Sequence, residues 1–164
     1  MNLKSAKAIV TGSSGGIGRA IALELGKQGT HVGLIARSED KLQETKKLVE
    51  ETGGHATIFP LDLRRIEDIY HLAEKLKTEW GHVNILVNVA GIYHDAAKAH
   101  YNIPFTKYST EEIKNTYEVG TNGTTFLTHA LLPLMPPRPI LSTYPARLKT
   151  VRRGGFHILY QSVQ

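Results

Sequence analysis

A glycine-rich stretch near the amino terminus has the residue types and spacing of a phosphate-binding turn. It reads Thr11-Gly-Ser-Ser-Gly-Gly-Ile-Gly18, follows the apolar run 6–10 and opens a stretch with helical periodicity. Its glycines allow a tight turn and let a ligand approach the backbone with no Cβ in between. A helix that begins there directs unpaired N–H groups and a partial positive charge at the turn, which favours a pyrophosphate. The spacing Gly-x3-Gly-x-Gly differs from G-x-G-x-x-G, so a plain turn is the alternative interpretation.

Apolar periodicity predicts the elements that hold this turn in place. Short β-prone apolar runs alternate with stretches whose apolar residues recur at helical spacing. The expected strands span 6–11, 31–36, 57–63 and 83–89, and the expected helices span 17–29, 38–52, 66–80 and 111–134. This alternation indicates a three-layer α/β domain with a parallel sheet and right-handed crossovers. Pro60 places the third strand at an edge, and the nearly all-apolar fourth strand is expected at the centre.

Within the later helices, the apolar positions define the faces that we expect to be buried. The helix at 38–52 presents Leu42, Leu48 and Val49. The helix at 66–80 presents Ile66, Ile69, Leu72, Ala73, Leu76 and Trp80. The helix at 111–134 presents Ile113, Tyr117, Phe126, Leu127, Leu131 and Leu132. A capping box at 109–112, with the sequence STEE, starts this last helix.

Composition narrows the class of protein. At 164 residues, with 41% apolar and 21% charged residues, the chain is long enough for one globular domain with its own core. The absence of cysteine excludes disulfides, thiolate catalysis and cysteine metal sites. The amino-terminal apolar run is too short for a signal peptide, and no stretch is long enough to cross a bilayer. We therefore expect a cytoplasmic protein with no membrane association.

The net charge of +5 is concentrated at the end of the chain. Residues 136–164 contain five basic residues and no acidic residue, whereas 1–135 contains 15 of each sign. A basic tail binds nucleic acid or anionic surfaces in some proteins. This tail has neither a helical pattern nor interleaved aromatic residues. We therefore favour a solvated segment and expect no nucleic-acid partner.

Four motifs, each at the end of an expected element, resemble the short-chain dehydrogenase/reductase family. After the turn at 11–18 come Asp62-Leu63, which end the third strand, and Asn88-Val-Ala-Gly91, which end the fourth. Residues 121–133, TNGTTFLTHALLP, look like the fourth long helix of that family. The resemblance covers 5–135 and implies a Rossmann-type doubly wound parallel sheet, here truncated. It also implies a nicotinamide dinucleotide laid across the carboxyl ends of the strands.

The resemblance implies a role for each cofactor-binding residue. Backbone N–H groups of the turn would hold the pyrophosphate, from Gly12, Ser14, Gly16, Ile17 and Gly18. Asp62, beside Leu63, would accept a hydrogen bond from the adenine amino group. The segment that contains Asn88, Ala90 and Gly91 would pass alongside the adenosine ribose. From the residues alone, a helix N-cap is the simpler interpretation of Asp62. Val89 replaces the family's second asparagine, and the loss of that polar side chain is expected to weaken cofactor binding.

Arg37, at the end of the second strand, bears on the choice of cofactor. NAD-selective members place an acidic residue there, about 20 residues after the glycines, to hold the ribose 2′-hydroxyl. This chain has Ala36-Arg37 instead, and a guanidinium can pair bidentately with a 2′-phosphate. We therefore predict NADP(H) as the cofactor in preference to NAD(H). A solvated arginine is the alternative.

The proton-donating pair of the family cannot be completed in this chain. That pair is a tyrosine followed four residues later by a lysine on the same helix face. None of the seven tyrosines has a lysine at that spacing, so we assign no catalytic residue. Tyr144 and Lys149 are five residues apart, which turns them about 140° around a helix. Pro145 also prevents a helix from running through Tyr144.

The remaining reactive positions of the family are also missing or displaced. Gly120 stands where the family has an asparagine that holds a water, and Asn122 points to a different face. Ser162 lies near the expected place of the family's serine, but the match there is weak. In the loop at 91–108, the spacing of the three metal-binding side chains His94, Asp95 and His100 fits no common site. We therefore expect these side chains to be solvated and assign no metal.

The composition changes at Pro136, which we take as the boundary between a domain at 1–135 and a Pro- and Arg-rich tail at 136–164. Four prolines fall within 136–145, so we expect no regular element to cross that stretch. A short last strand at 155–163 is considered for the tail. The change fits a truncated or frameshifted product, a fragment with an insertion before the fifth strand, or a non-catalytic descendant of an enzyme. We favour the first.

Two hypotheses for the function follow. In the first, the chain is an NADP(H)-binding oxidoreductase domain, derived from an enzyme that transfers hydride between NADP(H) and a small-molecule alcohol or carbonyl substrate. It is expected to show no appreciable turnover as it stands. In the second, it is a dinucleotide-binding or interaction module that never turns over a substrate. Members of the family associate through the helix at 111–134, which allows a homo-oligomer.

Overall fold

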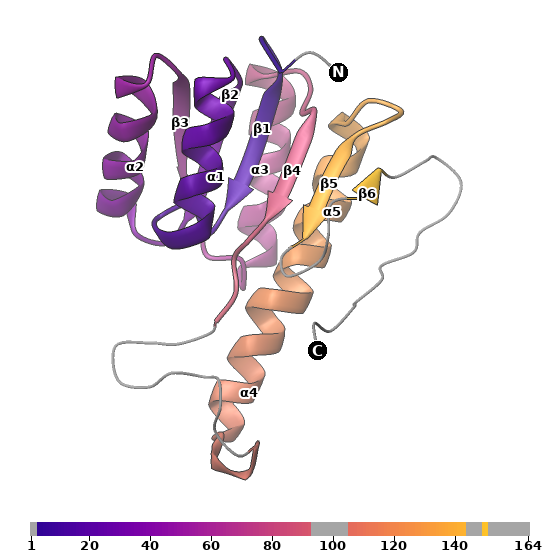
Figure 1. Cartoon of the computed structure of the whole chain (residues 1–164). Helices are drawn as coiled ribbons and strands as arrows, with labels where there is room; N and C mark the ends of the chain where they lie inside the picture. Colours follow the sequence, from indigo (N-terminus) through magenta and orange to yellow (C-terminus); the bar gives the residue numbers. More distant parts are fainter. Residues whose placement is uncertain (1–2, 93–104, 144–148, 151–164) are drawn as a thin grey trace.

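A parallel sheet runs through the middle of the molecule (Figure 1). The computed structural model describes residues 3–92, 105–143 and 149–150. Within this part the strand order is β3-β2-β1-β4-β5-β6. The strands are β1 (Lys7–Thr11), β2 (His31–Ala36), β3 (His55–Pro60), β4 (Ile85–Asn88), β5 (Ile140–Thr143) and β6 (Lys149–Thr150). The first five strands pair in parallel, and the short β6 pairs antiparallel with β5.

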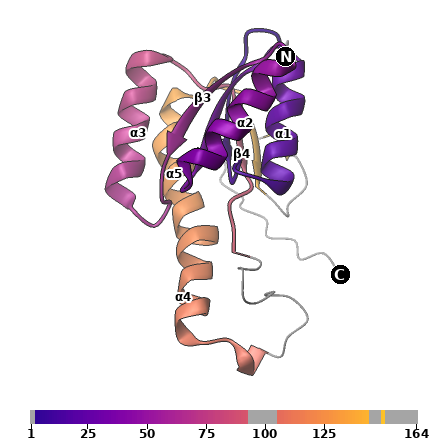
Figure 2. The ribbon, with the colours of Figure 1, turned by 90° about the vertical axis from the view of Figure 1, so that its left-hand side faces the viewer.

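Helices cover both faces of the sheet, so the predicted three-layer α/β fold is confirmed (Figure 2). One face carries α1 (Gly16–Lys27) and α2 (Glu39–Glu51), and the other carries α3 (Ile66–Glu79) and α5 (Thr124–Leu131). Each face has its own apolar core, because neighbouring residues of a strand point to opposite sides. In β1, for example, Ala8 and Val10 belong to one core and Ile9 to the other. None of the described helices is long and apolar enough to cross a membrane.

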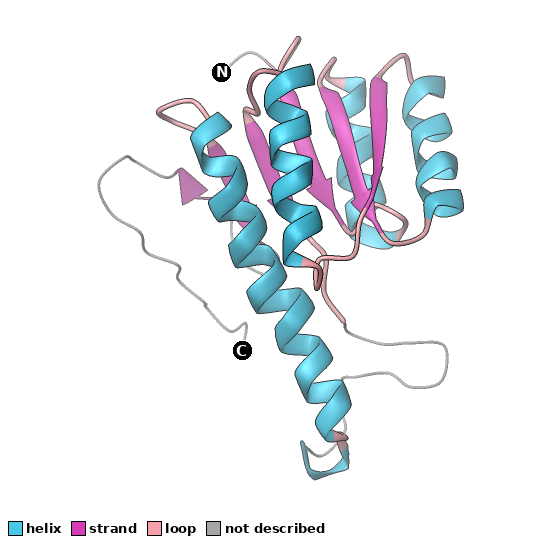
Figure 3. Ribbon diagram, turned by 180° about the vertical axis from the view of Figure 1, so that it is seen from behind, coloured by secondary structure: helices cyan, strands magenta, loops and turns pink. Residues whose placement is uncertain are grey.

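The long helix that follows β4 is irregular at its middle. The capping box is confirmed, since the Ser109 hydroxyl accepts the Glu112 N–H at 3.2 Å and the Glu112 carboxylate accepts the Ser109 N–H at 2.6 Å. Between α4 (Thr110–Tyr117) and α5 lies a π-helical stretch, Glu118–Gly123, which periodicity did not predict. Here a Cβ on Gly123 would lie 2.6 Å from the Leu63 carbonyl oxygen, so only glycine lets the helix pass this close. Beyond this contact α4 extends past the end of the sheet (Figure 3).

Three apolar residues that we expected to be buried are exposed. Leu48 and Ile66 are each 36% exposed, and Tyr117 on the projecting α4 is 62% exposed. In α2 the buried face consists of Leu42, Thr45 and Val49, because those positions lie three and four residues apart and Leu48 falls outside that stripe. A fully buried threonine therefore takes a place that we had assigned to a leucine.

The strand β5 contradicts the expectation that no regular element crosses 136–145. It fits between Pro139 and Pro145, so every residue that it contributes to the ladder has an N–H. Its register with β4 is regular, and the Ile140 N–H donates to the Asn84 carbonyl at 3.1 Å. The prediction of β3 as an edge strand is confirmed, although that strand begins and ends earlier than expected. The strand considered at 155–163 lies outside the described residues.

A cluster of rings closes the core at the amino-terminal end of the sheet. The His31 ring lies 4.6 Å from the Trp80 ring, and its Nε2 is 2.9 Å from the Thr57 hydroxyl oxygen. Burial lowers the pKa of His31, and the neighbouring charges of His55 and Lys7 lower it further. The neutral imidazole is therefore the form that fits the folded protein.

This arrangement predicts a loss of stability on mild acidification. The pKa of His31 lies below the unfolded value of 6.5, so the unfolded chain takes up more protons as the pH falls through that value. The free energy of unfolding in urea should therefore decrease between about pH 7.5 and about pH 5.5. His31→Gln should flatten this dependence, whereas His82→Gln, at an exposed position, should retain it. An unchanged pH dependence in His31→Gln would contradict the assignment.

Candidate functional site

A cleft of about 760 Å³ opens at the carboxyl ends of the central strands. It lies at the point where the chain order in the sheet reverses between β1 and β4, which is where open α/β sheets bind ligands. Among the residues that we predicted for a cofactor site, those that line the cleft are Gly12, Ser14, Gly16, Ile17, Gly18, Arg37, Asp62, Leu63, Ala90 and Gly91. Asn88 is the one predicted residue that does not line it.

The glycine turn forms one wall of the cleft, and the backbone approaches closely at two of its glycines. Gly12 has a φ of +67°, and a Cβ there would lie 3.0 Å from the Ala90 nitrogen. A Cβ on Gly18 would lie only 2.3 Å from the Gly12 carbonyl oxygen. The turn leads directly into α1, whose first turn contains no acidic side chain and whose N-cap, Gly15, has no side chain to cap it. The positive end of this helix is therefore not neutralised by its own residues.

Thr11 joins the turn to the neighbouring strand. Its buried hydroxyl oxygen accepts hydrogen bonds from the N–H groups of Val89 and Ala90, each at 3.0 Å. These bonds fix the end of β1 against the segment that follows β4. Val89 itself lines the cleft with an apolar side chain, where the family pattern has an asparagine.

Asn88 lies behind the cleft rather than in it. Its side chain is 1% exposed, and its Nδ2 donates to the Thr128 hydroxyl of α5 at 3.3 Å. The Oδ1 atom is buried with no hydrogen-bond partner among the described residues. The structure therefore places this side chain between the sheet and α5, outside the lining of the cleft.

Asp62 is held by an arginine two residues later. Its Oδ1 accepts the backbone N–H of Arg64 at 3.0 Å, and its two carboxylate oxygens contact the Arg64 guanidinium. The hydrogen bond from the Arg64 side chain is the main cause of the lowered pKa of Asp62, and the charge of Arg37 also lowers it. The helix α3 begins at Ile66, with Arg65 at the N-cap and no side-chain cap. Asp62 therefore caps the turn that precedes α3, and the interpretation of it as the helix N-cap is wrong.

The cleft has basic side chains at the end of β2 and the start of α2. Arg37 and Lys41 are exposed and line the cleft together with Ser38. Sequence reasoning singled out Arg37 and missed the other two. The signal for Lys41 was its position, because a residue one helical turn inside α2 lies on the same side as the residues that open the helix.

The helix α4–α5 contributes to the cleft only through its π-helical stretch. Val119 lines the cleft, next to Gly120, which stands at the family's asparagine position. Asn122 is exposed and does not line the cleft, in agreement with the prediction that it faces elsewhere. The described tyrosines lie outside the cleft; Tyr70, for example, has its hydroxyl 3.0 Å from His129 Nδ1.

Other reactive groups discussed from the sequence lie outside the described residues, namely Tyr144, Ser162, His94, Asp95 and His100. Within the described part of the chain, no three histidine, aspartate or glutamate side chains are grouped so that they could hold a metal ion.

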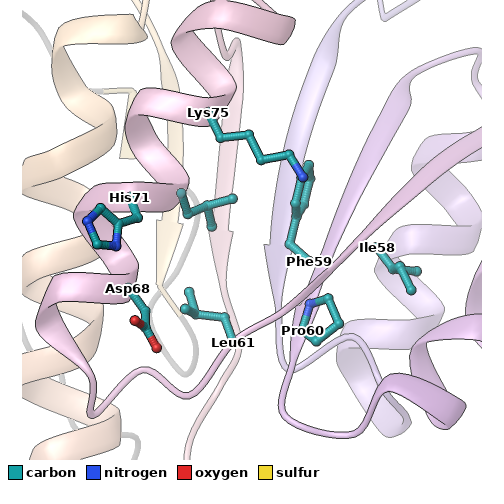
Figure 4. A pocket seen from close by; sticks show the side chains of 8 residues that line it. Ile58, Phe59, Pro60, Leu61, Asp68, His71 and Lys75 are labelled. Atoms are coloured by element: carbon teal, nitrogen blue, oxygen red, sulfur yellow. The ribbon is translucent and has the colours of Figure 1, made fainter.

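A second, smaller cavity of about 300 Å³ lies between β3 and α3. Asp68, His71, Leu72 and Lys75 of α3 line it together with the segment 58–61, and the Lys75 side chain extends toward Phe59 (Figure 4). None of the residues predicted from the sequence for cofactor binding lines this cavity. The larger cleft is therefore the candidate site.

Comparison with known proteins agrees with this geometry. The model of the short chain dehydrogenase family matches residues 6–139. A fatty acyl-CoA reductase from Acinetobacter baylyi is 41% identical over 90 residues, which cover 55% of this chain and 30% of the relative. A 2,3-dihydro-2,3-dihydroxybenzoate dehydrogenase from Bacillus subtilis is 32% identical over 116 residues, which cover 71% of this chain and 42% of the relative. The chain thus spans less than half the length of these curated relatives.

Solved structures show the same relationship. A metagenomic short-chain oxidoreductase in complex with NADP has a TM-score of 0.72 at 30% identity, with 82% of this chain and 58% of that chain covered. A protein of Escherichia coli CFT073 in complex with NADPH has a TM-score of 0.76 at 30% identity, with 87% and 59% covered. The family match begins immediately before β1 and ends immediately before β5. The chain belongs to the short-chain dehydrogenase family.

Proposed function

We propose that this chain binds NADP(H) in the cleft at the ends of β1, β2 and β4, as the cofactor half of an oxidoreductase. The observation that carries the proposal is the position of the glycine turn and Arg37 on the walls of one cleft. The turn suits a pyrophosphate, and the guanidinium suits a second phosphate at the other end of the adenosine. When bound, the nicotinamide supplies or accepts the hydride that interconverts an alcohol and a carbonyl compound.

The pyrophosphate would be held by the glycine turn and by the start of α1. Gly12 leaves no Cβ between the turn and the segment after β4, and Gly18 leaves none between α1 and the turn, so the backbone itself forms the wall. The unneutralised end of α1 and the N–H groups of Ser14, Gly16, Ile17 and Gly18 favour an anion there.

The 2′-phosphate of NADP(H) would be bound by Arg37, Ser38 and Lys41. Two cations and a hydroxyl suit a dianionic phosphate, whereas the 2′-hydroxyl of NAD(H) would have no carboxylate to accept its hydrogen bond. The NADP and NADPH complexes among the structural relatives support this choice.

The adenine and its ribose would lie between the ends of β3 and β4. The lowered pKa of Asp62 keeps its carboxylate ionised, so it can accept a hydrogen bond from the adenine amino group, with Leu63 beside the ring. Ala90 and Gly91 line the cleft where the ribose would pass. Asn88 would not touch the ribose; its hydrogen bond to Thr128 would hold the end of β4 in position.

A binding role without turnover is the second candidate, and a specific feature of the sequence favours it. The chain has no tyrosine followed four residues later by a lysine, and Val119 lines the cleft near Gly120 where the family has its asparagine. Proton transfer to a carbonyl oxygen needs a positioned acid, and none of the described cleft residues supplies one. Membership of the family favours the oxidoreductase over the module that only binds. The same proposal includes association of two copies of the chain along α4–α5.

The choice of cofactor gives the first test of the proposed function. Calorimetric titration should show tighter binding of NADPH than of NADH to the wild-type chain. Arg37→Ala should weaken NADPH binding by roughly 10- to 100-fold, because a charge-assisted hydrogen bond contributes about 1.5–3 kcal/mol, and it should leave NADH binding nearly unchanged. Arg65→Ala, at an exposed position outside the cleft, is the matched control. Tighter binding of NADH by the wild type would contradict the assignment.

The glycine turn gives a second test. Gly18→Ala should reduce NADPH affinity at least about tenfold and cost about 1–3 kcal/mol of stability, because its Cβ would collide with the Gly12 carbonyl oxygen. Gly15→Ala adds the same methyl group to the same turn where no atom lies within 4 Å, so it should retain the wild-type stability. Urea unfolding and titration of both variants provide the comparison; equal behaviour of the two would refute the close approach.

A third test concerns turnover. The purified 164-residue chain should bind NADPH without oxidising it in the presence of aldehydes, ketones or acyl-CoA esters, followed by the absorbance of NADPH. Measurable, substrate-dependent oxidation would overturn the predicted inactivity and would require an acid other than the tyrosine–lysine pair.

A further inference from the structure

Two side chains from outside the glycine turn hold its backbone carbonyl groups. The Thr45 hydroxyl, on the buried face of α2, donates to the Ser13 carbonyl at 2.9 Å. The Arg19 guanidinium, on α1, donates through Nη2 to the Ser14 carbonyl at 2.8 Å. Arg19 Nε also donates to the Thr45 hydroxyl oxygen at 2.9 Å, so the two side chains form one network.

The arrangement of donors fixes the direction of the Thr45 proton. A threonine hydroxyl has one hydrogen, and here its oxygen accepts from Arg19, so the hydrogen must point to a carbonyl. The Ser13 carbonyl at 2.9 Å competes with the Lys41 carbonyl at 3.0 Å. Lys41 lies inside α2, where its carbonyl already takes part in the helical ladder. The Ser13 carbonyl is therefore the group that depends on Thr45.

Holding these two carbonyls sets the direction of the N–H groups that follow them. In a planar trans peptide, the C=O of one residue and the N–H of the next point in opposite directions. A Ser13 carbonyl directed at Thr45 turns the Ser14 N–H away from α2. A Ser14 carbonyl directed at the Arg19 guanidinium, which lies against Thr45 and Glu44 of α2, turns the Gly15 N–H away from that guanidinium. Ser14 and Gly15 both line the cleft.

We propose that Thr45 and Arg19 are positioning residues for the dinucleotide, because they aim the N–H groups of Ser14 and Gly15 at its pyrophosphate. This inference rests on the proposed function. Thr45 also lies one helical turn after Lys41, in the helix that Arg37 and Ser38 precede. The same hydroxyl therefore connects the pyrophosphate turn to the helix that carries the 2′-phosphate site.

The contact between α1 and α2 does not depend on this network. A Cβ on Gly54 would lie 2.8 Å from the Gly26 Cα, and a Cβ on Gly26 would lie 2.6 Å from the Val49 Cγ1. The two helices are thus packed together by close apolar contact near the other end of α1. Removing the Thr45 hydroxyl is therefore expected to alter the turn and to leave the spacing of the helices unchanged.

Thr45→Val and Thr45→Ser form the decisive pair of variants. Valine keeps the shape and loses the hydrogen bonds, whereas serine retains the hydroxyl and loses a methyl group. Calorimetric titration of the full chain with NADPH should show a loss of about tenfold for Thr45→Val and a change of no more than about twofold for Thr45→Ser. The amide resonances of Ser14 and Gly15 should shift in Thr45→Val and stay near the wild-type positions in Thr45→Ser.

Arg19→Leu and Glu44→Gln provide a second pair in case Thr45→Val fails to fold. Arg19 is partly exposed and pairs with Glu44 at 3.1 Å, so both substitutions break the surface ion pair, but only the first loses the bond to the Ser14 carbonyl. Arg19→Leu should bind NADPH at least about fivefold more weakly, and Glu44→Gln should bind like the wild type, because exposed pairs contribute little.

The outcomes separate this inference from the proposed function. No binding of NADPH by the wild-type chain overturns the proposed function and the positioning role with it. Binding by the wild type together with equal affinities of Thr45→Val and Thr45→Ser, or of Arg19→Leu and Glu44→Gln, overturns the positioning role alone. Weaker binding confined to Thr45→Val and Arg19→Leu supports it.

Discussion

The close approach of the glycine turn to the segment after β4 is the constraint on which the candidate site depends. Gly12 faces the Ala90 backbone, and Gly18 lies directly against the Gly12 carbonyl, at separations that leave no room for a side chain. This packing brings the start of α1 to the cleft, which Gly16, Ile17 and Gly18 line. The Thr11 hydroxyl then ties β1 to Val89 and Ala90. A dinucleotide would therefore meet backbone on this wall, and that wall cannot adjust by a change of rotamer.

The sheet order brings this wall into one cleft with Arg37, Ser38 and Lys41, the residues proposed to select NADP(H) over NAD(H). Since β1 lies between β2 and β4, the turn after β1, the basic segment after β2 and the segment after β4 all open at one end of the sheet. The two apolar cores hold that arrangement from both faces, with Val10 and Ile9 of the same strand buried in different cores. The fold thus brings together residues that lie far apart in the sequence. The strands that end at the cleft also form the apolar cores.

The sequence predicted the features that follow from the spacing of apolar residues and glycines. It did not predict the residues whose role depends on buried polar contacts between distant parts of the chain. Apolar spacing predicted β1 to β4, and glycine spacing predicted the turn, because both follow from local geometry. The strand β5 was missed because its pairing with β4 outweighs the prolines around it. Thr45 was missed because periodicity does not distinguish a buried threonine from a solvent-facing one. The π-helical stretch was also missed; it ends at Gly123, which packs against Leu63, a residue distant in the sequence.

The electrostatics of the cleft separate binding from reaction. Arg37 and Lys41 line the cleft, and the pKa of the Asp62 carboxyl is lowered, chiefly by the hydrogen bond from the Arg64 side chain. These are the groups that the proposed function uses for phosphate and adenine. Around the π-helical stretch the described lining is Val119, which neither donates nor accepts a proton. Binding energy comes from interactions that the cofactor makes whether or not a substrate is present, whereas proton transfer needs a group placed beside the reacting oxygen. Under the proposed function, selection of the cofactor and turnover of a substrate are therefore separable properties of this cleft.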